Sequence, residues 1–288
     1  SFGNITGLTQ QLSSSGATVS GSPNLTNAPT SYNSGQHGTR TFTVTSATNN
    51  VSTSNINVNS STGAVTVPAG TGATVVTVTV STAGGTNYAA GSQTYTVTFT
   101  KISSLSLSFS SPTAVAWGTE VPAVTPSGYN QTEMGTLSYA GSASGINVAS
   151  NGTVTATQPG SVDVTVSTAG GTKYNAVSNV GTYSVTFNKQ DLTINGPSGI
   201  AGTLGSTVDV ALAGSTGYNS STMGAVTYSI NNTGNTAGAT ISGSTLSLSG
   251  ATISPAAASA TIQIRATIAS NGYYNAATVD YNVTVSRA

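Results

Sequence analysis

The sequence predicts an all-β chain of three tandem antiparallel β-sandwiches, and three observations lead to this fold class. A hairpin-like stretch occurs twice almost unchanged and a third time in a weaker form. Ser and Thr supply roughly a third of the residues and are interleaved with Val and Tyr, a composition that favours strands. No segment of a dozen residues shows the 3.6-residue apolar period of an amphipathic helix, because Gly and Thr interrupt every candidate.

The repeated stretch reads as two alternating strands joined by a glycine-bearing connection. The connection leads into a strand in which Tyr, Val and Phe alternate with polar residues, mostly Thr or Ser. Such alternation places apolar side chains on one buried face and hydroxyl side chains on the other. The three copies are STAGGTNY at 81–88 with YTVTF at 95–99, STAGGTKY at 167–174 with YSVTF at 183–187, and ASNGYY at 269–274 with YNVTV at 281–285.

A second marker recurs with similar spacing and helps to define the domains. It consists of Tyr-Asn, a glycine five residues after the Asn, and an aromatic residue on the following strand. Successive copies of the markers lie roughly 86 to 100 residues apart, the size of one Ig-like sandwich domain. A basic residue closes each repeat, so we predict domains 1–101 (ending at Lys101), 102–189 (ending at Lys189) and 190–288 (with Arg287 near its end). The marker copies are Tyr32-Asn33 with Gly38 and Phe42, Tyr129-Asn130 with Gly135 and Tyr139, and Tyr218-Asn219 with Gly224 and Tyr228.

The strands expected in each domain differ mainly at its start. Domains two and three open with residues of clean two-residue period, whereas the apolar residues that open domain one fit neither a strand nor a helix. The first strand of domain one is therefore expected to be either bulged or unpaired within its own domain. The opening residues are Leu105, Leu107 and Phe109 in domain two, Leu192 and Ile194 in domain three, and Phe2, Ile5, Leu8 and Leu12 in domain one.

Each domain is then expected to contain about seven short strands separated by turn signals, including a short strand pair around a turn. The very short linkers predict domains that sit end to end with limited hinge freedom. The strand pairs are Ile56 and Val58 with Val65 and Val67, Ile146 and Val148 with Val154, and Ile241 with Leu246 and Leu248.

Composition excludes several classes of function. Charged residues make up 4% of the 288 residues, against about 25% in ordinary soluble domains, and six basic residues balance six acidic ones, so no nucleic-acid partner is expected. The absence of cysteine rules out a disulfide framework and thiolate metal sites. No apolar run approaches the ~20 residues of a membrane helix, so no membrane insertion is expected. The chain starts at Ser1 without a basic and apolar leader, and we expect an extracellular or cell-surface protein, secreted after removal of a signal peptide.

The polar residues suggest no catalytic or metal site. His37, the only histidine, stands where the other repeats carry Met134 and Met223, which predicts a packing or loop position. Domain one has no Asp or Glu to act as its acidic partner. A Lys–Asn isopeptide bond needs a nearby carboxylate; Lys173 with Asp163 is a pair to consider, but a turn lysine is the simpler interpretation. We expect no catalytic residue, no metal and no cofactor.

Candidate sugar contacts are of two kinds. Nine asparagines precede X-Ser/Thr, close to the roughly eight expected by chance at this Asn and hydroxyl content, so they are candidate glycosylation sites only. Tyr273, beside Gly272 in a loop, offers a ring for sugar stacking. Trp117, the only tryptophan, stands where domain three has Leu204 and is expected to pack. The asparagines are Asn4, Asn24, Asn50, Asn59, Asn130, Asn151, Asn219, Asn231 and Asn282.

Four runs in domain three, GAVTYSI at 224–230, ATISGSTL at 239–246, YNAA at 274–277 and YNVTV at 281–285, resemble bacterial Ig-like repeats. Such repeats build the stalks of prokaryotic adhesins and other surface proteins, and the likeness extends over all three domains. It implies three tandem Ig-like antiparallel β-sandwiches in a cell-surface context, without naming a ligand. The chain has far fewer Lys, Asp and Glu than usual members, which argues against calcium-rigidified linkers, because each site needs several carboxylates.

The predicted surface indicates a structural function. Sheet faces coated with Ser and Thr carry little charge to keep copies apart, and the strands lack the lysines that usually protect sheet edges. We expect a subunit of an extracellular filament, sheath or surface layer that assembles with copies of itself, with Phe2, Ile5 and Leu8 donating a strand to a neighbour. The alternative is an adhesin stalk or carbohydrate-binding fragment of a larger cell-surface protein, with glycans as partners. An enzyme is not expected.

Overall fold

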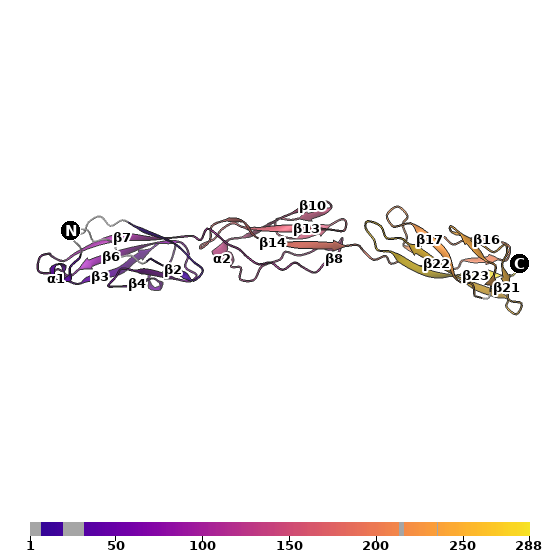
Figure 1. The fold of residues 1–288 in the computed structure, drawn as a ribbon, viewed down its shortest axis with the longest axis horizontal. Coiled ribbons are helices and arrows are strands. Elements are labelled where there is room, and N and C mark those ends of the chain that lie inside the picture. The colour runs from indigo at the N-terminus through magenta and orange to yellow at the C-terminus, as the bar shows by residue number, and fades with distance from the viewer. Residues whose placement is uncertain (1–6, 20–31, 213–215, 235) are drawn as a thin grey trace.

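The three repeats fold into β-sandwiches that follow one another along an extended rod (Figure 1). The computed structural model describes residues 7–19, 32–212, 216–234 and 236–288. Within these ranges the regular structure is nearly all β, with strands β1 to β23 against two single-turn α-helices and one 3₁₀ turn. The prediction of an all-β chain of tandem Ig-like sandwiches is therefore confirmed.

Domain one pairs a four-stranded sheet of order β1-β7-β6-β3 with a three-stranded sheet of order β2-β5-β4. Contrary to expectation, the opening strand β1 (Leu8–Gln11) is regular and runs parallel to β7 (Gly91–Thr100) of the same domain, with Leu8 opposite Val97. Phe2 and Ile5 lie outside the described residues. The other elements are β2 (Gly16–Val19), α1 (Ser34–His37), β3 (Arg40–Ala47), η1 (Thr53–Asn55), β4 (Asn57–Val58), β5 (Val65–Pro68) and β6 (Thr74–Thr82).

Domain two repeats this plan, with sheets of order β8-β14-β13-β9 and β10-β11-β12. As in domain one, the first strand of the domain, β8, pairs in parallel with the last strand, β14. The elements are β8 (Val115–Ala116), α2 (Gln131–Met134), β9 (Leu137–Ala140), β10 (Ser142–Ala143), β11 (Ile146–Val148), β12 (Val154–Ala156), β13 (Gly160–Thr168) and β14 (Val177–Asn188).

Domain three has the same four-stranded sheet, in the order β15-β23-β22-β17, and two smaller sheets, β16-β20-β19 and β18-β21. The elements are β15 (Ala201–Thr203), β16 (Thr207–Asp209), β17 (Val226–Asn232), β18 (Thr236–Ala237), β19 (Thr240–Ser242), β20 (Thr245–Ser247), β21 (Thr252–Ile253), β22 (Ser259–Ile268) and β23 (Ala277–Ser286).

The openings of domains two and three differ from the prediction. Leu105, Leu107 and Phe109 pack against the core of domain two, as their period predicts, yet residues 103–114 form no strand. Leu107 N–H donates to the Val180 carbonyl oxygen, and no other backbone–backbone hydrogen bond joins this stretch to a described residue. Leu192 and Ile194 likewise pack on the core of domain three without forming a strand. The two-residue apolar period shows which side chains face the core, but it does not show whether their backbone pairs with a neighbouring strand.

Strict alternation separates core from surface in the long central strands. In β6, Val76, Val78 and Val80 are fully buried while the residues between them are partly exposed. Complete burial of a valine contributes roughly 1.5 to 3 kcal/mol. The same alternation in β13 and β22 gives each sandwich its own core cluster and leaves the outer faces to Thr, Ser and other polar residues.

Candidate functional site

The sequence markers meet at one end of each sandwich, where the Tyr-Asn marker forms a tight turn. In all three copies the tyrosine hydroxyl donates a hydrogen bond to the carbonyl oxygen of the marker glycine. The spacing between Tyr and Gly is therefore the span of a turn that the hydroxyl closes. The bonds join Tyr32 to Gly38 (2.8 Å), Tyr129 to Gly135 (2.5 Å) and Tyr218 to Gly224 (3.0 Å).

The asparagine and the glycine of the marker have separate roles in this turn. The side chains of Asn33 and Asn130 accept two backbone N–H groups each and cap α1 and α2. Gly135 has a φ of 84°, and a Cβ there would lie 2.2 Å from the carbonyl oxygen of Gly170 in the repeated hairpin. Only glycine allows the turn and the hairpin to approach this closely.

The connection of the repeated hairpin, here called the end loop (residues 85–89, 171–175 and 271–275), rests on this turn. In domains one and two a single carbonyl of the turn accepts two successive N–H groups of the end loop; in domain three a side chain of the end loop donates to the turn instead. The bonds are Asn87 and Tyr88 to Gln36 (3.3 and 3.2 Å), Lys173 and Tyr174 to Glu133 (both 3.1 Å), and Asn271 Nδ2 to Thr222 (2.8 Å).

The end loop of domain two binds the linker that leaves domain one, at a contact we call junction one. Ile102 N–H donates to the carbonyl of Lys173, and Asn175 N–H donates to the carbonyl of Ile102, both at 2.9 Å. The result is a parallel bridge with Ile102 opposite Tyr174.

Junction two, between domains two and three, uses the same backbone arrangement. Gln190 N–H donates to the carbonyl of Tyr273 at 3.1 Å, and Asn275 N–H donates to the carbonyl of Gln190 at 2.9 Å. Gln190 lies opposite Tyr274 in a parallel bridge. An isoleucine and a glutamine thus serve equally, because the main chain makes the contact.

Junction one is reinforced by a buried lysine. The Lys173 side chain is 2% exposed, and its Nζ donates to the carbonyl of Ser14 in domain one at 3.2 Å. The expectation of a plain turn lysine missed this interdomain contact. Asp163 instead accepts a hydrogen bond from the hydroxyl of Ser184, so Lys173 and Asp163 are not brought together as an isopeptide site would require.

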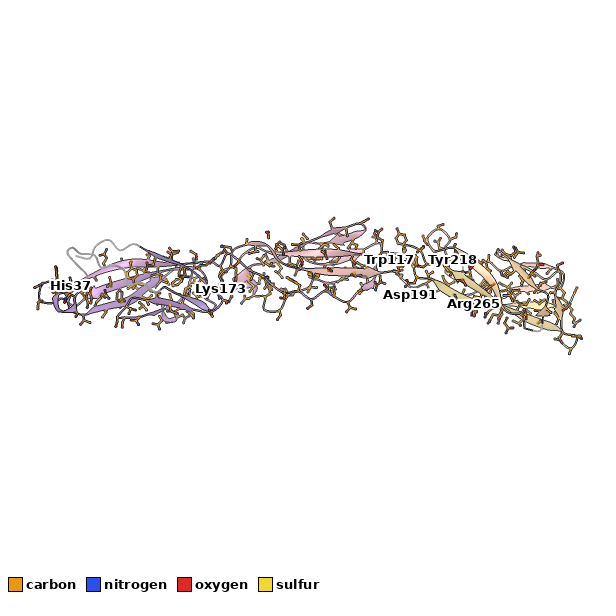
Figure 2. All side chains as sticks on the ribbon, in the orientation of Figure 1. His37, Trp117, Lys173, Asp191, Tyr218 and Arg265 are labelled. Atoms are coloured by element: carbon orange, nitrogen blue, oxygen red, sulfur yellow. The ribbon has the colours of Figure 1, made fainter. Side chains whose placement is uncertain are left out.

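Junction two is reinforced by aromatic side chains, and Figure 2 shows Trp117 at this junction. Trp117 Nε1–H donates to the carbonyl of Tyr273 at 2.9 Å, and the indole ring lies edge-on to Tyr273 and Tyr274 at 6.0 and 5.8 Å. Gln190 Nε2 donates to the carbonyl of Trp117 at 2.7 Å. Trp117 packs, as expected, but partly against the neighbouring domain. Tyr273, the candidate sugar-stacking residue, is 43% exposed and already contacts Trp117.

The end loop of domain one lies at the other end of the rod, where Figure 2 shows His37, and among the described residues no linker backbone bonds to it. Tyr88 is 39% exposed there, whereas Tyr174, its counterpart at junction one, is 9% exposed. The His37 ring stacks on Tyr88 with ring centroids 4.4 Å apart and planes 3° from parallel. Within the described ranges, the N–H of Ala89 and the carbonyl of Asn87 have no hydrogen-bond partner.

The candidate glycosylation sites are exposed wherever the structure describes them. Asn4 and Asn24 lie outside the described residues. Several of the others also have a local role, in which the side-chain oxygen accepts backbone N–H groups of the following turn. The exposed sites are Asn50, Asn59, Asn130, Asn151, Asn219, Asn231 and Asn282, and those with a capping role are Asn59, Asn130, Asn151 and Asn219.

Ionisable groups are dispersed over the described part of the chain. It contains one ion pair, Arg265 with Asp280 at 2.7 Å across β22 and β23, and the hydrogen bond from Arg265 lowers the pKa of the Asp280 carboxyl. No group of three or more His, Cys, Asp or Glu side chains among these residues is placed to hold a metal ion. Burial raises the pKa of the Tyr95 phenol to about 12. A hollow of about 510 Å³ beside junction one is lined by neutral residues and Lys101.

The outer sheet faces are coated with hydroxyl groups. On β6 and β7, Thr77 lies directly opposite Thr96, and on β13 and β14 the hydroxyls of Ser161 and Thr186 are 3.0 Å apart. Such faces offer hydrogen-bond donors and acceptors to a neighbour without the cost of burying charge.

Comparison with known proteins gives a limited result. No protein-family model matches the chain, and no curated protein matches its sequence. Among solved structures the chain is similar to Drosophila N-cadherin EC1-4, at 11% identity and a TM-score of 0.29 over 100% of this chain and 75% of that one. It is also similar to mouse cadherin-23 EC22-24, at 13% identity and a TM-score of 0.33 over 99% and 96%. At these values we draw neither a ligand nor a function from the neighbours.

None of the helices in the described ranges has the length and hydropathy needed to cross a membrane.

Proposed function

We propose that the chain is a rod-shaped structural subunit of an extracellular filament, sheath or surface layer that assembles with copies of itself. The observation that carries the proposal is the use of one backbone contact, linker residue on end loop, at both junctions. Units that contact only their neighbours through one repeated interface build a long element from short parts.

The surface supports association along the sides of the rod. Among the described strands, β3, β9 and β17 each lie at the edge of a four-stranded sheet. Soluble sandwiches protect such edges with lysine or proline, but these three strands contain neither, and Arg40 is their only charged residue. With a formal net charge of zero, long-range repulsion does not oppose contact between copies.

A second candidate function is an adhesin stalk or carbohydrate-binding fragment of a larger cell-surface protein. The exposed rings of Tyr88 and Tyr273 favour it, since aromatic faces stack on sugars. The same rod would then act as a spacer that holds a binding domain away from its anchor.

Electron microscopy of the purified chain at rising concentration distinguishes the two functions. The structural function predicts regular filaments or sheets when the chain is crowded. Dispersed rods, three domains long, at every concentration would refute the self-assembling subunit and leave the stalk as the better explanation.

A further inference from the structure

We propose that the end loop of domain one is the docking site for the C-terminal segment of a second copy, so that chains join head to tail through a third junction of the same kind. The inference rests on the proposed self-assembly and names the contact that would propagate it.

The backbone groups that make junctions one and two have counterparts in domain one that bond to none of the described residues. By position in the end loop, Ala89 corresponds to Asn175, whose N–H donates to the carbonyl of Ile102 at junction one. Asn87 corresponds to Lys173, whose carbonyl accepts the N–H of Ile102. In the described part of domain one neither group has a partner, and Tyr88 between them is exposed. The end loop therefore presents one donor, one acceptor and one aromatic ring to solvent.

This end loop is closed by the same internal hydrogen bond as the two occupied end loops. In all three domains this bond joins the N–H of the first loop residue to the carbonyl of the tyrosine at the fourth position. In domain one the His37 ring also stacks on the ring of this tyrosine. Binding would therefore require little ordering of the loop. The bonds are Gly85 to Tyr88 (2.8 Å), Gly171 to Tyr174 (3.0 Å) and Asn271 to Tyr274 (3.1 Å).

The C-terminal segment has the register of the two linkers. The N–H groups of Leu12, Trp117 and Leu204 donate to the carbonyls of Thr100, Asn188 and Ser286, which makes these three carbonyl residues equivalent. Each is followed by a basic residue and then by the linker position, which Ile102, Gln190 and Ala288 occupy.

The segment that contains Arg287 and Ala288 is also held in a defined direction. The guanidinium of Arg287 donates to the carbonyls of Ile253, Ser254 and Ala257. Ala288 is exposed, and within the described residues it makes no hydrogen bond. In the proposed contact, the N–H of Ala288 donates to the backbone carbonyl of Asn87 in a second copy. The N–H of Ala89 in that copy donates to the backbone carbonyl of Ala288.

The placement of the two ends requires a second chain. Helix α1 and the C-terminus lie at opposite ends of the rod (Figure 1), so one chain cannot satisfy both. A head-to-tail contact of this kind repeats without limit along an axis. Charge favours this pairing slightly, because residues 1–101 contain two basic and no acidic residues, whereas residues 190–288 contain two basic and three acidic residues.

Because the chain has no cysteine, a disulfide can test the contact directly. Residues opposite each other in a bridge lie within the ~4.4–6.8 Å Cα separation that a disulfide needs. We expect the Tyr88→Cys and Ala288→Cys variants, mixed under mild oxidation, to form a mixed dimer. The Tyr273→Cys variant is the matched control, since Tyr273 is 43% exposed, against 39% for Tyr88, but lies on an occupied end loop. A mixed dimer at least about tenfold faster than the control pair supports the contact, and equal rates overturn it.

A second measurement separates this contact from self-assembly as such. Ala89→Pro removes the free N–H, and Ala89→Ser keeps it. In sedimentation experiments up to about millimolar concentration, we expect Ala89→Pro to weaken end-to-end association on the order of tenfold, from the lost hydrogen bond and the added ring, and Ala89→Ser to match the parent chain. Filaments that persist unchanged in Ala89→Pro, without the mixed disulfide, would refute the docking site while leaving the structural function standing. A parent chain that stays monomeric throughout would refute both.

Discussion

Replacing Trp117 with Leu, the residue at the corresponding position of domain three, should loosen junction two while both flanking sandwiches stay folded. The substitution removes the hydrogen bond from Nε1 to the Tyr273 carbonyl and the edge-on contacts with Tyr273 and Tyr274. A hydrogen bond of this kind contributes about 0.5 to 1.5 kcal/mol, and so does each aromatic pair. The expected loss is therefore about 1.5 to 4.5 kcal/mol, towards the lower end because Leu retains some packing.

Amide hydrogen exchange measured by NMR reports this loss at the junction itself. The amides of Gln190 and Asn275 exchange only when junction two opens, since both are bonded across it. A loss of 1.5 kcal/mol corresponds to at least roughly tenfold faster exchange. Trp117→Phe keeps a ring but no donor, and should accelerate exchange only about fivefold.

Junction one provides the internal control for this experiment. The amides of Ile102 and Asn175 make the same contact about one domain away and share no residue with Trp117. Their exchange should be unchanged in both variants. Equal acceleration at both junctions would mean that the substitution destabilises the chain generally, and unchanged exchange at Gln190 would mean that Trp117 does not hold the junction; either result refutes the reasoning.

Three further predictions concern other parts of the chain. Gly135→Ala should lower the thermal midpoint more than Gly128→Ala: both sites have positive φ, but only at Gly135 would a Cβ strike a backbone oxygen, and equal shifts would contradict this. Because burial raises the pKa of Tyr95 to about 12, the unfolded chain loses this proton first, so stability should fall as the pH rises from about 10 to about 12. Denaturant titrations should show a smaller fall for Tyr95→Phe, and an identical fall would exclude Tyr95 as the cause. Lys173→Met should accelerate amide exchange at Ile102 and leave junction two unchanged; protection retained at Ile102 would argue against the buried lysine contact.

Local patterns in the sequence predict the sandwiches but only part of their hydrogen bonding. Alternation in β6, β13 and β22 identifies the inward side chains correctly, because pleating fixes the side-chain period. The opening of domain two shows the limit of this signal. Leu105, Leu107 and Phe109 face the core, yet Ser111 Oγ, not a backbone group, accepts the Ser184 N–H farther along. Ladder formation depends on the neighbouring strand, which local sequence does not describe.

The interdomain contacts of Trp117 and Lys173 escape sequence patterns for a related reason. The sequence predicts a packing residue and a turn residue, but their partners Tyr273 and Ser14 lie in other domains, far away in sequence. The available signal was positional. Ile102 and Gln190 each follow the closing basic residue, and the repeated loop with its Gly-Gly or Asn-Gly turn recurs once per domain. The sequence reveals that recurrence, but only the fold brings linker and loop together.

Small-angle X-ray scattering of the dilute chain tests the central claim most directly, namely that a linker residue bound to an end loop holds neighbouring sandwiches in line. The two junctions predict scattering from a single straight rod, three domains long and one domain wide. The Gln190→Pro variant lacks the N–H that donates to the Tyr273 carbonyl, so its rod should be bent or more flexible at junction two. A parent chain that already scatters as a flexible string of independent domains would contradict the account.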